Sequence, residues 1–175
     1  EAGRPSLAAV GVQRPDLYQL HAPDPRTPPA TSVRALEQLK REGLVAAIGL
    51  CNVTVGQIEE ARRIVDIDSV QVEVSVWHDH HFLSGVVDYC LANRLRLLAY
   101  RPLGGLSRRR KTASDPTLTA IAARHGATAF EIALAWLMDL SDLIVPIAGA
   151  THVETVLSIV RAGDIVLTDG DRSEL

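Results

Sequence analysis

Residues 46–64 read AAIGLCNVTVGQIEEARRI, and this stretch contains both of the patterns that decide the fold. Ala46–Asn52 is apolar almost throughout, as expected for a strand that helices cover on both faces of a parallel sheet. Thr54 and Gln57 then have the spacing of a capping box at a helix N-terminus. Apolar residues follow at helical spacing, at Ile58, Ala61 and Ile64. The stretch therefore predicts one strand followed by one helix.

The same alternation continues in both directions along the chain. Short runs rich in Val, Ile and Leu are separated by longer segments with helical periodicity. The predicted strands are Asp16–His21, Ala46–Asn52, Ser69–Ser75, Arg96–Pro102 and Leu143–Gly149. Residues 22–29 (APDPRTPP) predict a rigid, proline-rich loop after the first strand.

Three of the predicted helices have clear sequence boundaries. Thr31 or Ser32 can cap a helix that ends at Gly43, with Glu37 and Arg41 placed to pair across one turn. Asp115 and Pro116 predict a cap and a first-position proline for a second helix. Thr128 and Glu131 repeat the capping-box spacing before a run rich in Ala and Leu that extends to Leu140.

Five strand–helix units fit either an open doubly wound sheet or part of a (β/α)8 barrel. Polar residues stand at the C-terminal ends of several strands, where a barrel builds its active site. A nucleotide-binding open sheet would instead show a glycine-rich turn after its first strand, and the residues from His21 to Asp24 do not form one. We therefore favour the barrel.

Composition excludes several classes of protein. The 175 residues carry a net charge of −3, and the only basic run, 108–111, has no interleaved aromatic residues, so we expect no nucleic-acid partner. No apolar stretch is long enough for a membrane span, and Glu1–Pro5 lacks the pattern of a signal peptide. Cys51 and Cys90 have no disulfide-framework or CxxC spacing. We expect a cytoplasmic protein with free thiols.

Several ordered motifs resemble the aldo-keto reductase family from about Asp16 to the C-terminus. Residues 16–24 (DLYQLHAPD) resemble the family signature DLY-x-L-H-x-P-D. Residues 35–52 resemble its A-L-E-x-L to I-G-V-S-N stretch. The segments 70–73 (VQVE), 98–104 (LAYRPLG) and 145–151 (VPIAGAT) resemble VQ-x-E-Y, AYSPLG and VPIPG in the same order.

This resemblance implies a TIM-type (β/α)8 barrel and NADPH-dependent reduction of aldehydes and ketones. Residues 1–175 would form the C-terminal part of the barrel, about five βα units, with the N-terminal units absent. The family uses an Asp, a Tyr, a Lys and a His, because hydride attack builds negative charge on the carbonyl oxygen, which a proton donor must neutralise. His21 matches the His, while the other three lie on earlier units. We therefore expect the chain alone to be incomplete for catalysis.

The resemblance also implies a set of NADP(H)-binding residues. Asn52 and Gln71 match the pair that binds the nicotinamide carboxamide, next to Cys51, and Tyr100 matches the ring that stacks on nicotinamide. The pyrophosphate would lie along the backbone of Pro102, Leu103 and Gly104, and Arg101, which replaces a common Ser, would make a cofactor contact that the resemblance does not specify. The adenosine end and its 2′-phosphate would contact Gly149, Ala150, Thr151, His152 and Glu154, where helix N-terminal amides favour an anion.

Several of these residues could instead have purely structural roles. His21 could be a histidine bonded to backbone, Asn52 a turn residue, Cys51 a small core residue and Tyr100 core filler. Departures from the family pattern occur at Arg101, where Ser is common, beyond Gly105, and at Ser158 and Ile159. The run 77–81 (WHDHH) offers imidazoles and a carboxylate, but adjacent ligands in one loop rarely converge, so we predict no metal site.

Two hypotheses follow. The first is the cofactor-binding part of an aldo-keto reductase that acts on a small carbonyl substrate. The second is a non-catalytic, barrel-derived binding module or a domain of a larger protein. A sheet that cannot close exposes two edges and apolar helix surface, so we expect the missing N-terminal half or a self-association partner to cover them.

Overall fold

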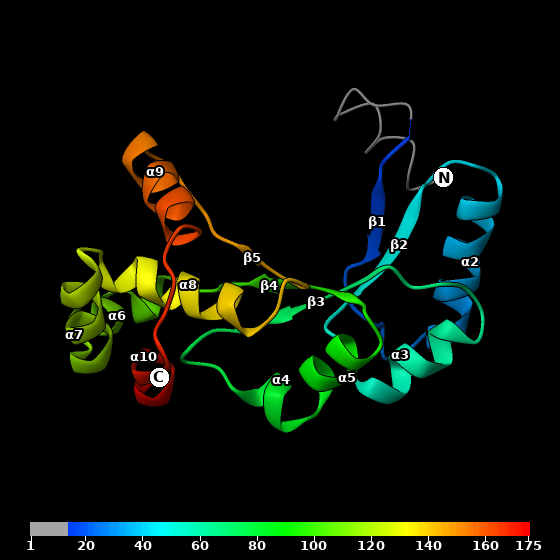
Figure 1. Cartoon of the computed structure of the whole chain (residues 1–175). Helices are drawn as coiled ribbons and strands as arrows, with labels where there is room; N and C mark the ends of the chain where they lie inside the picture. The colour runs from blue at the N-terminus through cyan, green and yellow to red at the C-terminus, as the bar shows by residue number, and fades with distance from the viewer. Residues whose placement is uncertain (1–13) are drawn as a thin grey trace. The chain divides into compact units, whose positions relative to one another are not determined.

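The computed structural model describes residues 14–175, and it divides the chain into two compact units, residues 1–71 and 72–175. Each unit is described separately, with elements labelled as in Figure 1. Glu1–Pro5, the basis of the signal-peptide argument, lie outside the described residues.

The first unit alternates strands and helices. Its elements are β1 (Leu17–Leu20), α2 (Pro29–Arg41), β2 (Ala47–Cys51), α3 (Val55–Arg62) and β3 (Ser69–Glu73), whose last residues enter the second unit. β2 pairs in parallel with both β1 and β3. The register places Leu20 opposite Leu50 and Cys51 opposite Gln71, so the C-terminal ends of these strands lie side by side.

Local sequence accounts for most helix boundaries in the first unit, with one correction. The capping box of Thr54 and Gln57 is formed, and Arg41 pairs with Glu37 at 3.5 Å. The prediction that Thr31 or Ser32 caps α2 is wrong, because α2 begins at Pro29 with Pro28 as its N-cap. Proline at the first helical position has a suitable φ and needs no N–H partner, so the helix starts one turn earlier.

The second unit contains two further strands and most of the helices. Its elements are α4 (His80–Leu83), α5 (Val86–Ala92), β4 (Arg96–Tyr100), the short 3-10 helix η1 (Leu106–Arg108), α6 (Arg109–Ser114), α7 (Pro116–His125), α8 (Ala129–Leu140), β5 (Ile144–Ile147), α9 (Val153–Ala162) and α10 (Asp169–Glu174). β4 and β5 are parallel, with Tyr100 opposite Ile147. The predicted caps are confirmed, because Asp115 accepts a hydrogen bond from the Leu118 amide and Thr128 forms its capping box with Glu131.

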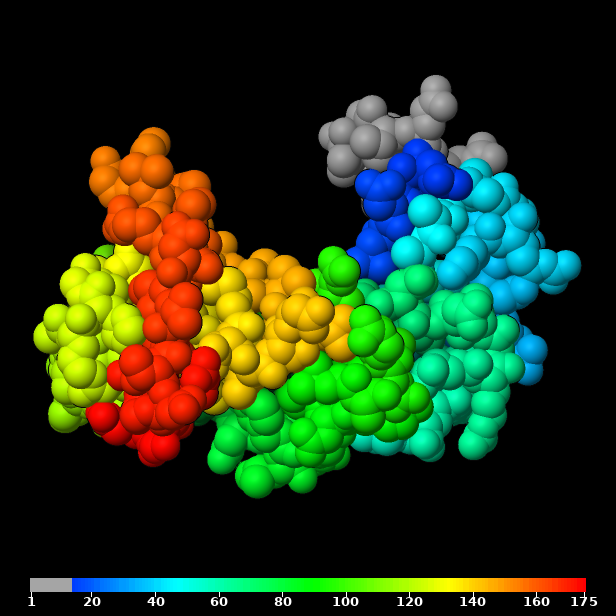
Figure 2. Space-filling model, viewed as in Figure 1, coloured from blue at the N-terminus to red at the C-terminus, as the bar shows by residue number. Residues whose placement is uncertain are grey.

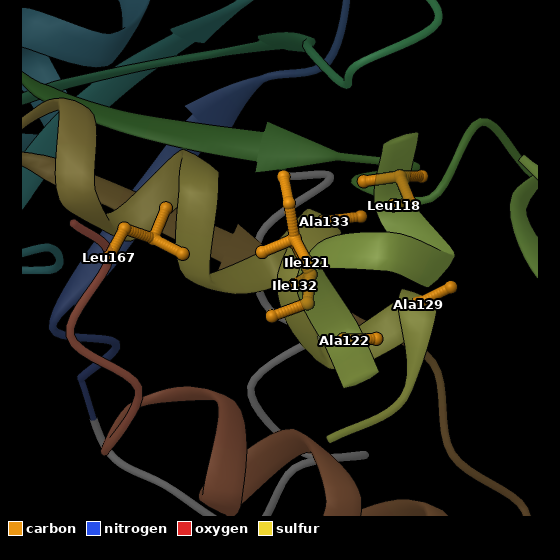
Figure 3. Close-up of a cluster of buried hydrophobic side chains, with 7 residues drawn as sticks. All are labelled: Leu118, Ile121, Ala122, Ala129, Ile132, Ala133 and Leu167. Atoms are coloured by element: carbon orange, nitrogen blue, oxygen red, sulfur yellow. The ribbon is translucent and has the colours of Figure 1, made fainter. Parts of the chain in front are cut away.

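A cluster of buried apolar side chains joins α7 to α8 (Figure 3). α7 supplies Leu118, Ile121 and Ala122, and α8 supplies Ala129, Ile132 and Ala133. Leu167, just before α10, completes the cluster. This core fixes the helices behind the loop that follows β4, because Trp77 and Leu103 pack against it.

All five strands predicted from sequence are present, each within one or two residues of its expected ends. The α/β architecture with parallel strand pairs is therefore confirmed. The described residues contain five strands and form no closed barrel, which would need eight. No helix in residues 14–175 is both long and apolar enough to cross a membrane.

Candidate functional site

In the first unit, Asn52 connects the C-terminal ends of three strands. Its backbone has a left-handed φ of 57°, which Asn tolerates better than most residues. Its backbone N–H donates to the Gln71 carbonyl at 2.9 Å, and its side-chain Nδ2 donates to the His21 carbonyl at 3.1 Å. The structure thus brings together three of the residues predicted for this site.

The neighbours of Asn52 differ in exposure. The His21 ring is exposed after β1, and Gln71 is half-buried between buried Val70 and Val72. Cys51 is buried at the end of β2, and burial raises the pKa of its thiol. Cys51 is therefore a neutral thiol at neutral pH, which agrees with its alternative role as a small core residue.

In the second unit, the residues after β4 form a tight turn. Tyr100 is half-buried at the end of the strand, and Arg101 has a left-handed φ of 48°. The Gly104 N–H donates to the Arg101 carbonyl at 2.7 Å, and both Gly104 and Gly105 have positive φ. Pro102 is buried, Leu103 and Gly104 are half-buried, and Arg101 is exposed.

The side chains packed around this turn explain why residue 104 is a glycine. A Cβ on Gly104 would lie 2.7 Å from Arg108 Cγ and 2.8 Å from Trp77 Cδ1. Trp77 is itself held by a hydrogen bond from Nε1 to Thr112 Oγ1 at 2.9 Å and by Lys111 Nζ, 4.2 Å from the ring centroid. Close packing against Trp77 and Arg108, together with the positive φ, therefore favours glycine at position 104.

Arg101 stands where Ser is common in the family, and its charge has a partner. Arg101 Nη1 lies 3.5 Å from Glu73 Oε2, while 65% of the Arg101 side chain is exposed. A pair this long and exposed contributes little stability, so the guanidinium can turn toward an anion at small cost. Glu73 was not predicted as a site residue, because its partner is 28 positions away in sequence.

The loop after β5 presents the last group of predicted residues. Gly149, Ala150, Thr151, His152 and Glu154 are all exposed. His152 is the N-cap of α9, and its side chain makes no capping bond, while its backbone carbonyl accepts from the Thr155 N–H at 3.1 Å. Glu154 stands in the first turn of α9, and its negative charge would oppose a phosphate there.

Ser158 and Ile159 depart from the family pattern, and Ser158 has a structural contact. Ser158 Oγ donates to Glu131 Oε1 at 2.8 Å, and Arg161 Nε donates to the same oxygen at 3.0 Å. Glu131 is buried, which by itself raises its pKa, but bonds from Thr128, Ser158 and Arg161 outweigh burial and lower the pKa below 4.5. The sequence predicted only the capping role of Glu131, which its capping box with Thr128 confirms.

The histidines at residues 78–81 lie close together without a preformed metal centre. Ring centroids are 5.0 Å apart for His80 and His81, and 6.1 Å for His78 and His81. Burial and the neighbouring rings lower the pKa of His81. Within residues 14–175, no group of three or more His, Cys, Asp or Glu side chains could hold a metal ion.

Two hollows in the structure lie away from the predicted residues. One of 510 Å³ lies beside the C-terminal ends of α2 and α3 and includes Lys40 and Arg62 in its lining. The other, of 300 Å³, includes His125 and Arg161. Neither is lined by any of the predicted cofactor-binding residues.

The fold and these strand-end residues define an α/β protein of the kind found in barrel enzymes, and comparison with known proteins gives the family. The model of the aldo/keto reductase family matches residues 1–175. The chain belongs to this family.

Among curated relatives, an uncharacterized oxidoreductase of Schizosaccharomyces pombe is 29% identical over 165 residues, which cover 93% of this chain and 52% of the relative. Pyridoxine 4-dehydrogenase of Escherichia coli is 35% identical over 122 residues, covering 70% of this chain and 41% of the relative. The chain thus spans about half the length of these relatives.

Solved structures show the same fold. A thermostable aldo-keto reductase in complex with the inhibitor epalrestat superposes with a TM-score of 0.87 at 29% identity, covering 97% of this chain and 62% of that protein. An aldo-keto reductase from Klebsiella pneumoniae, in complex with NADPH, gives a TM-score of 0.90 at 24% identity, covering 99% of this chain and 62% of that protein.

Proposed function

We propose that this chain is the nicotinamide-binding, C-terminal part of a cytoplasmic aldo/keto reductase barrel that reduces a small carbonyl substrate with NADPH. The observation that carries the proposal is the arrangement around Asn52, which joins His21 and Gln71 at the C-terminal ends of three parallel strands. This edge is where (β/α)8 barrels place their active sites. The match to the family over residues 1–175 supports it.

Each unit, taken by itself, contains residues whose groups suit such a cofactor. In the first unit, Asn52 and Gln71 supply side-chain amides for the nicotinamide carboxamide. In the second, the half-buried Tyr100 supplies a ring, and the turn at Gly104 and Gly105 lies beside the exposed charge of Arg101. The first turn of α9 supplies amides for a phosphate.

The chemistry divides between the cofactor and the protein. NADPH supplies a hydride when bound. His21 would orient the substrate carbonyl, and the proton for the developing oxyanion must come from a Tyr tuned by Lys and Asp. None of these three matches a residue of this chain, so the proposed role here is to bind the cofactor and orient the substrate.

A second candidate is a non-catalytic binding module derived from the barrel. The contact of Ser158 with Glu131 favours it, because a residue that lies near adenosine in the family pattern is used here to hold α9 to α8. Glu154 in the first turn of α9 also favours it. A module of this kind would keep the fold and bind NADPH weakly or not at all.

Fluorescence titration with NADPH distinguishes the two candidates. We expect saturable binding that Tyr100→Ala and His152→Ala each weaken about fivefold, the size of one lost contact of about 1 kcal/mol. Arg34→Ala, an exposed residue on α2, is the control and should leave binding unchanged. Absence of binding, or binding that neither site variant affects, would favour the module.

A further inference from the structure

Three histidine side chains gather in the segment between β3 and α5, and we call His78, His80 and His81 the histidine cluster. Their ring centroids are 5.0 Å apart for His80 and His81, 6.1 Å for His78 and His81, and 6.2 Å for His78 and His80. The short helix α4, which contains His80 and His81, lies at the surface, in green in Figures 1 and 2. Three groups that each take up a proton near neutral pH therefore lie close together.

Two of these rings place a nitrogen where a proton is poorly accommodated. The Nδ1 atoms of His78 and His81 are both buried, and neither forms a hydrogen bond with any of residues 14–175. An imidazolium carries a hydrogen on each ring nitrogen, so a protonated His78 or His81 holds a buried N–H without an acceptor. Such a donor loses its bond to water and gains none in the protein, so the packed segment disfavours the charged form.

Charged side chains in or beside this segment act in both directions. They are Glu73 of β3, Asp79 beside the histidines, Arg101 after β4 and Lys111 of α6. Glu73 favours protonation of His81, and Arg101 lies 3.5 Å from Glu73 and offsets part of its charge. Burial, followed by His80 and His78, outweighs Glu73 and lowers the pKa of His81. Protonation of the cluster is therefore opposed as long as the segment stays packed.

Aromatic contacts on both sides of the cluster hold the segment to its unit. Trp77 Nε1 donates to Thr112 Oγ1 of α6 at 2.9 Å, and Trp77 packs against the core of α7 and α8. Phe82 lies beside Trp136 of α8, with ring centroids 6.0 Å apart. A Cβ on Gly104 would lie 2.8 Å from Trp77 Cδ1, so the turn after β4 also packs on Trp77. A change in the cluster therefore acts on the contacts of both aromatic residues.

We propose that the histidine cluster is a pH-sensitive switch that keeps residues 77–83 packed on α6 and α8 at neutral pH and releases them in mild acid. Protons add positive charge to neighbouring rings, and release brings the buried Nδ1 atoms into water, where the charged form is solvated. Release also withdraws Trp77 from the turn at Gly104, which the proposed function places beside the cofactor. The switch itself needs no cofactor, so it can fail or hold independently of that function.

The direction of the pH effect follows from the lowered pKa of His81. A histidine whose folded pKa lies below its ordinary value of 6.5 binds more protons when the segment is released. The packed segment keeps its full stability above that pH and loses stability as the pH falls below it. Glu73 and Asp79 belong to a class that ordinarily titrates near about pH 4, so carboxylates do not cause a change at about pH 5–6.5.

Tryptophan fluorescence tests the switch, because Trp77 lies in the segment, Trp136 contacts it, and the chain contains two tryptophans. As the pH is lowered from about 8 to about 5, we expect the emission maximum to move several nanometres to longer wavelength, with a midpoint at about pH 5–6.5. The double variant His78→Phe, His81→Phe keeps two rings that cannot titrate, so its emission should stay constant. His152→Phe makes the same change at the exposed N-cap of α9 and should leave the shift as it is.

Far-UV circular dichroism over the same pH range separates release of the segment from unfolding of the chain, and we expect a constant helical signal. An emission shift that persists in a folded double variant overturns the proposal. So does constant emission from the unaltered chain, or a loss of helical signal that accompanies the shift, because the whole unit then unfolds. His78→Gln, His81→Gln, which keeps polar side chains without a charge, provides the same test if phenylalanine disturbs the fold at neutral pH.

Discussion

In the first unit, close packing around one residue restricts which side chain can occupy its position. Gly49 lies buried in β2, and a Cβ there would contact Ser69 Oγ and approach Gln19 Cγ to 2.8 Å. Gln19 and Ser69 are joined by a hydrogen bond of 3.4 Å across the sheet. A side chain at position 49 would therefore have to displace Gln19 or Ser69 on the two neighbouring strands.

We expect Gly49→Ala to destabilise the protein by about 1–3 kcal/mol, the usual cost of overpacking a buried site. Urea unfolding measures the change. Gly56→Ala is the matched control, because its added Cβ meets no atom within 4 Å and α3 gains about 0.5–1 kcal/mol from alanine. Equal midpoints for Gly49→Ala and the unaltered chain would show that the close contacts at Gly49 are absent.

Glu131 combines two roles that only the structure connects. Its Oε2 accepts from the Thr128 N–H at 2.7 Å, and its Oε1 accepts from Ser158 and Arg161 of α9. The capping box was predictable, because both residues lie within four positions of each other. The contacts with α9 were not, because they join residues 27 and 30 positions apart.

We expect Glu131→Ala to cost about 2–3 kcal/mol, since it removes the cap and leaves buried polar groups without partners. Glu131→Gln should cost less, because its carbonyl oxygen can still accept from Thr128 while the charge that pairs with Arg161 is lost. Thermal unfolding compares the two variants. Identical losses would contradict this account, because they would mean that the bond from Thr128, which Glu131→Gln can keep, contributes nothing.

Among the elements, α10 is joined to α7 through the buried carboxylate of Asp171. Asp171 bonds to Arg124 and His125 at the end of α7, with distances of 2.6 Å to Arg124 Nη2 and 2.8 Å to His125 Nε2, and it also closes the capping box with Thr168. Bonds from His125, Arg124 and Thr168 hold the pKa of Asp171 below its ordinary value of 3.8. The contact thus requires an ionised carboxylate.

The sign of the pH effect follows from that lowered pKa. A carboxyl whose folded pKa is depressed stabilises the fold above its unfolded pKa, and this stabilisation is lost as the pH falls through the folded value. We expect Asp171→Asn to lower the unfolding temperature by several degrees at pH 7, with the difference shrinking below about pH 4. Asp169→Asn, on the exposed side of α10, is the control and should have a much smaller effect. A constant difference between pH 7 and pH 3 would contradict this account.

The elements also show what sequence patterns could predict. Apolar runs identified all five strands, and the Thr54, Asp115 and Thr128 caps were confirmed because capping is a contact between near neighbours. The start of α2 was missed because the pattern of threonine and serine was preferred over proline at the first helical position. The exposure of Val153, Leu157 and Val160 on α9 was not predictable either, since periodicity shows that a helix has an apolar face and not what covers that face.

For the chain as a whole, the sequence identified the family through motifs in the correct order. What it could not supply was the geometry that links distant segments. Arg101 was noted only as a departure from Ser, and its contact with Glu73 and the dependence of Gly104 on Trp77 appear only in the folded unit. The residues predicted at each strand end lie where expected, and their binding role stays a prediction.

The last prediction concerns the activity of the 175-residue chain by itself. We expect no NADPH oxidation above the buffer rate with a panel of aldehydes, because hydride transfer needs a proton donor at the carbonyl oxygen. The described tyrosines do not match that donor: Tyr18 lies within β1, Tyr89 within α5, and Tyr100 at the end of β4. Full-length E. coli pyridoxine 4-dehydrogenase, assayed with its own substrate, confirms that the conditions support turnover.

Activity in the isolated chain would contradict this expectation. Single variants of the chain would then show which residue donates the proton. Tyr18→Phe, Tyr89→Phe and Tyr100→Phe each remove one phenolic proton and keep the ring, so loss of turnover in one variant would name the donor. His21→Ala would separate substrate orientation from proton donation, because an orienting residue affects KM and kcat without abolishing the proton source. If all four variants kept the activity, the proton would come from a group that the family pattern does not include.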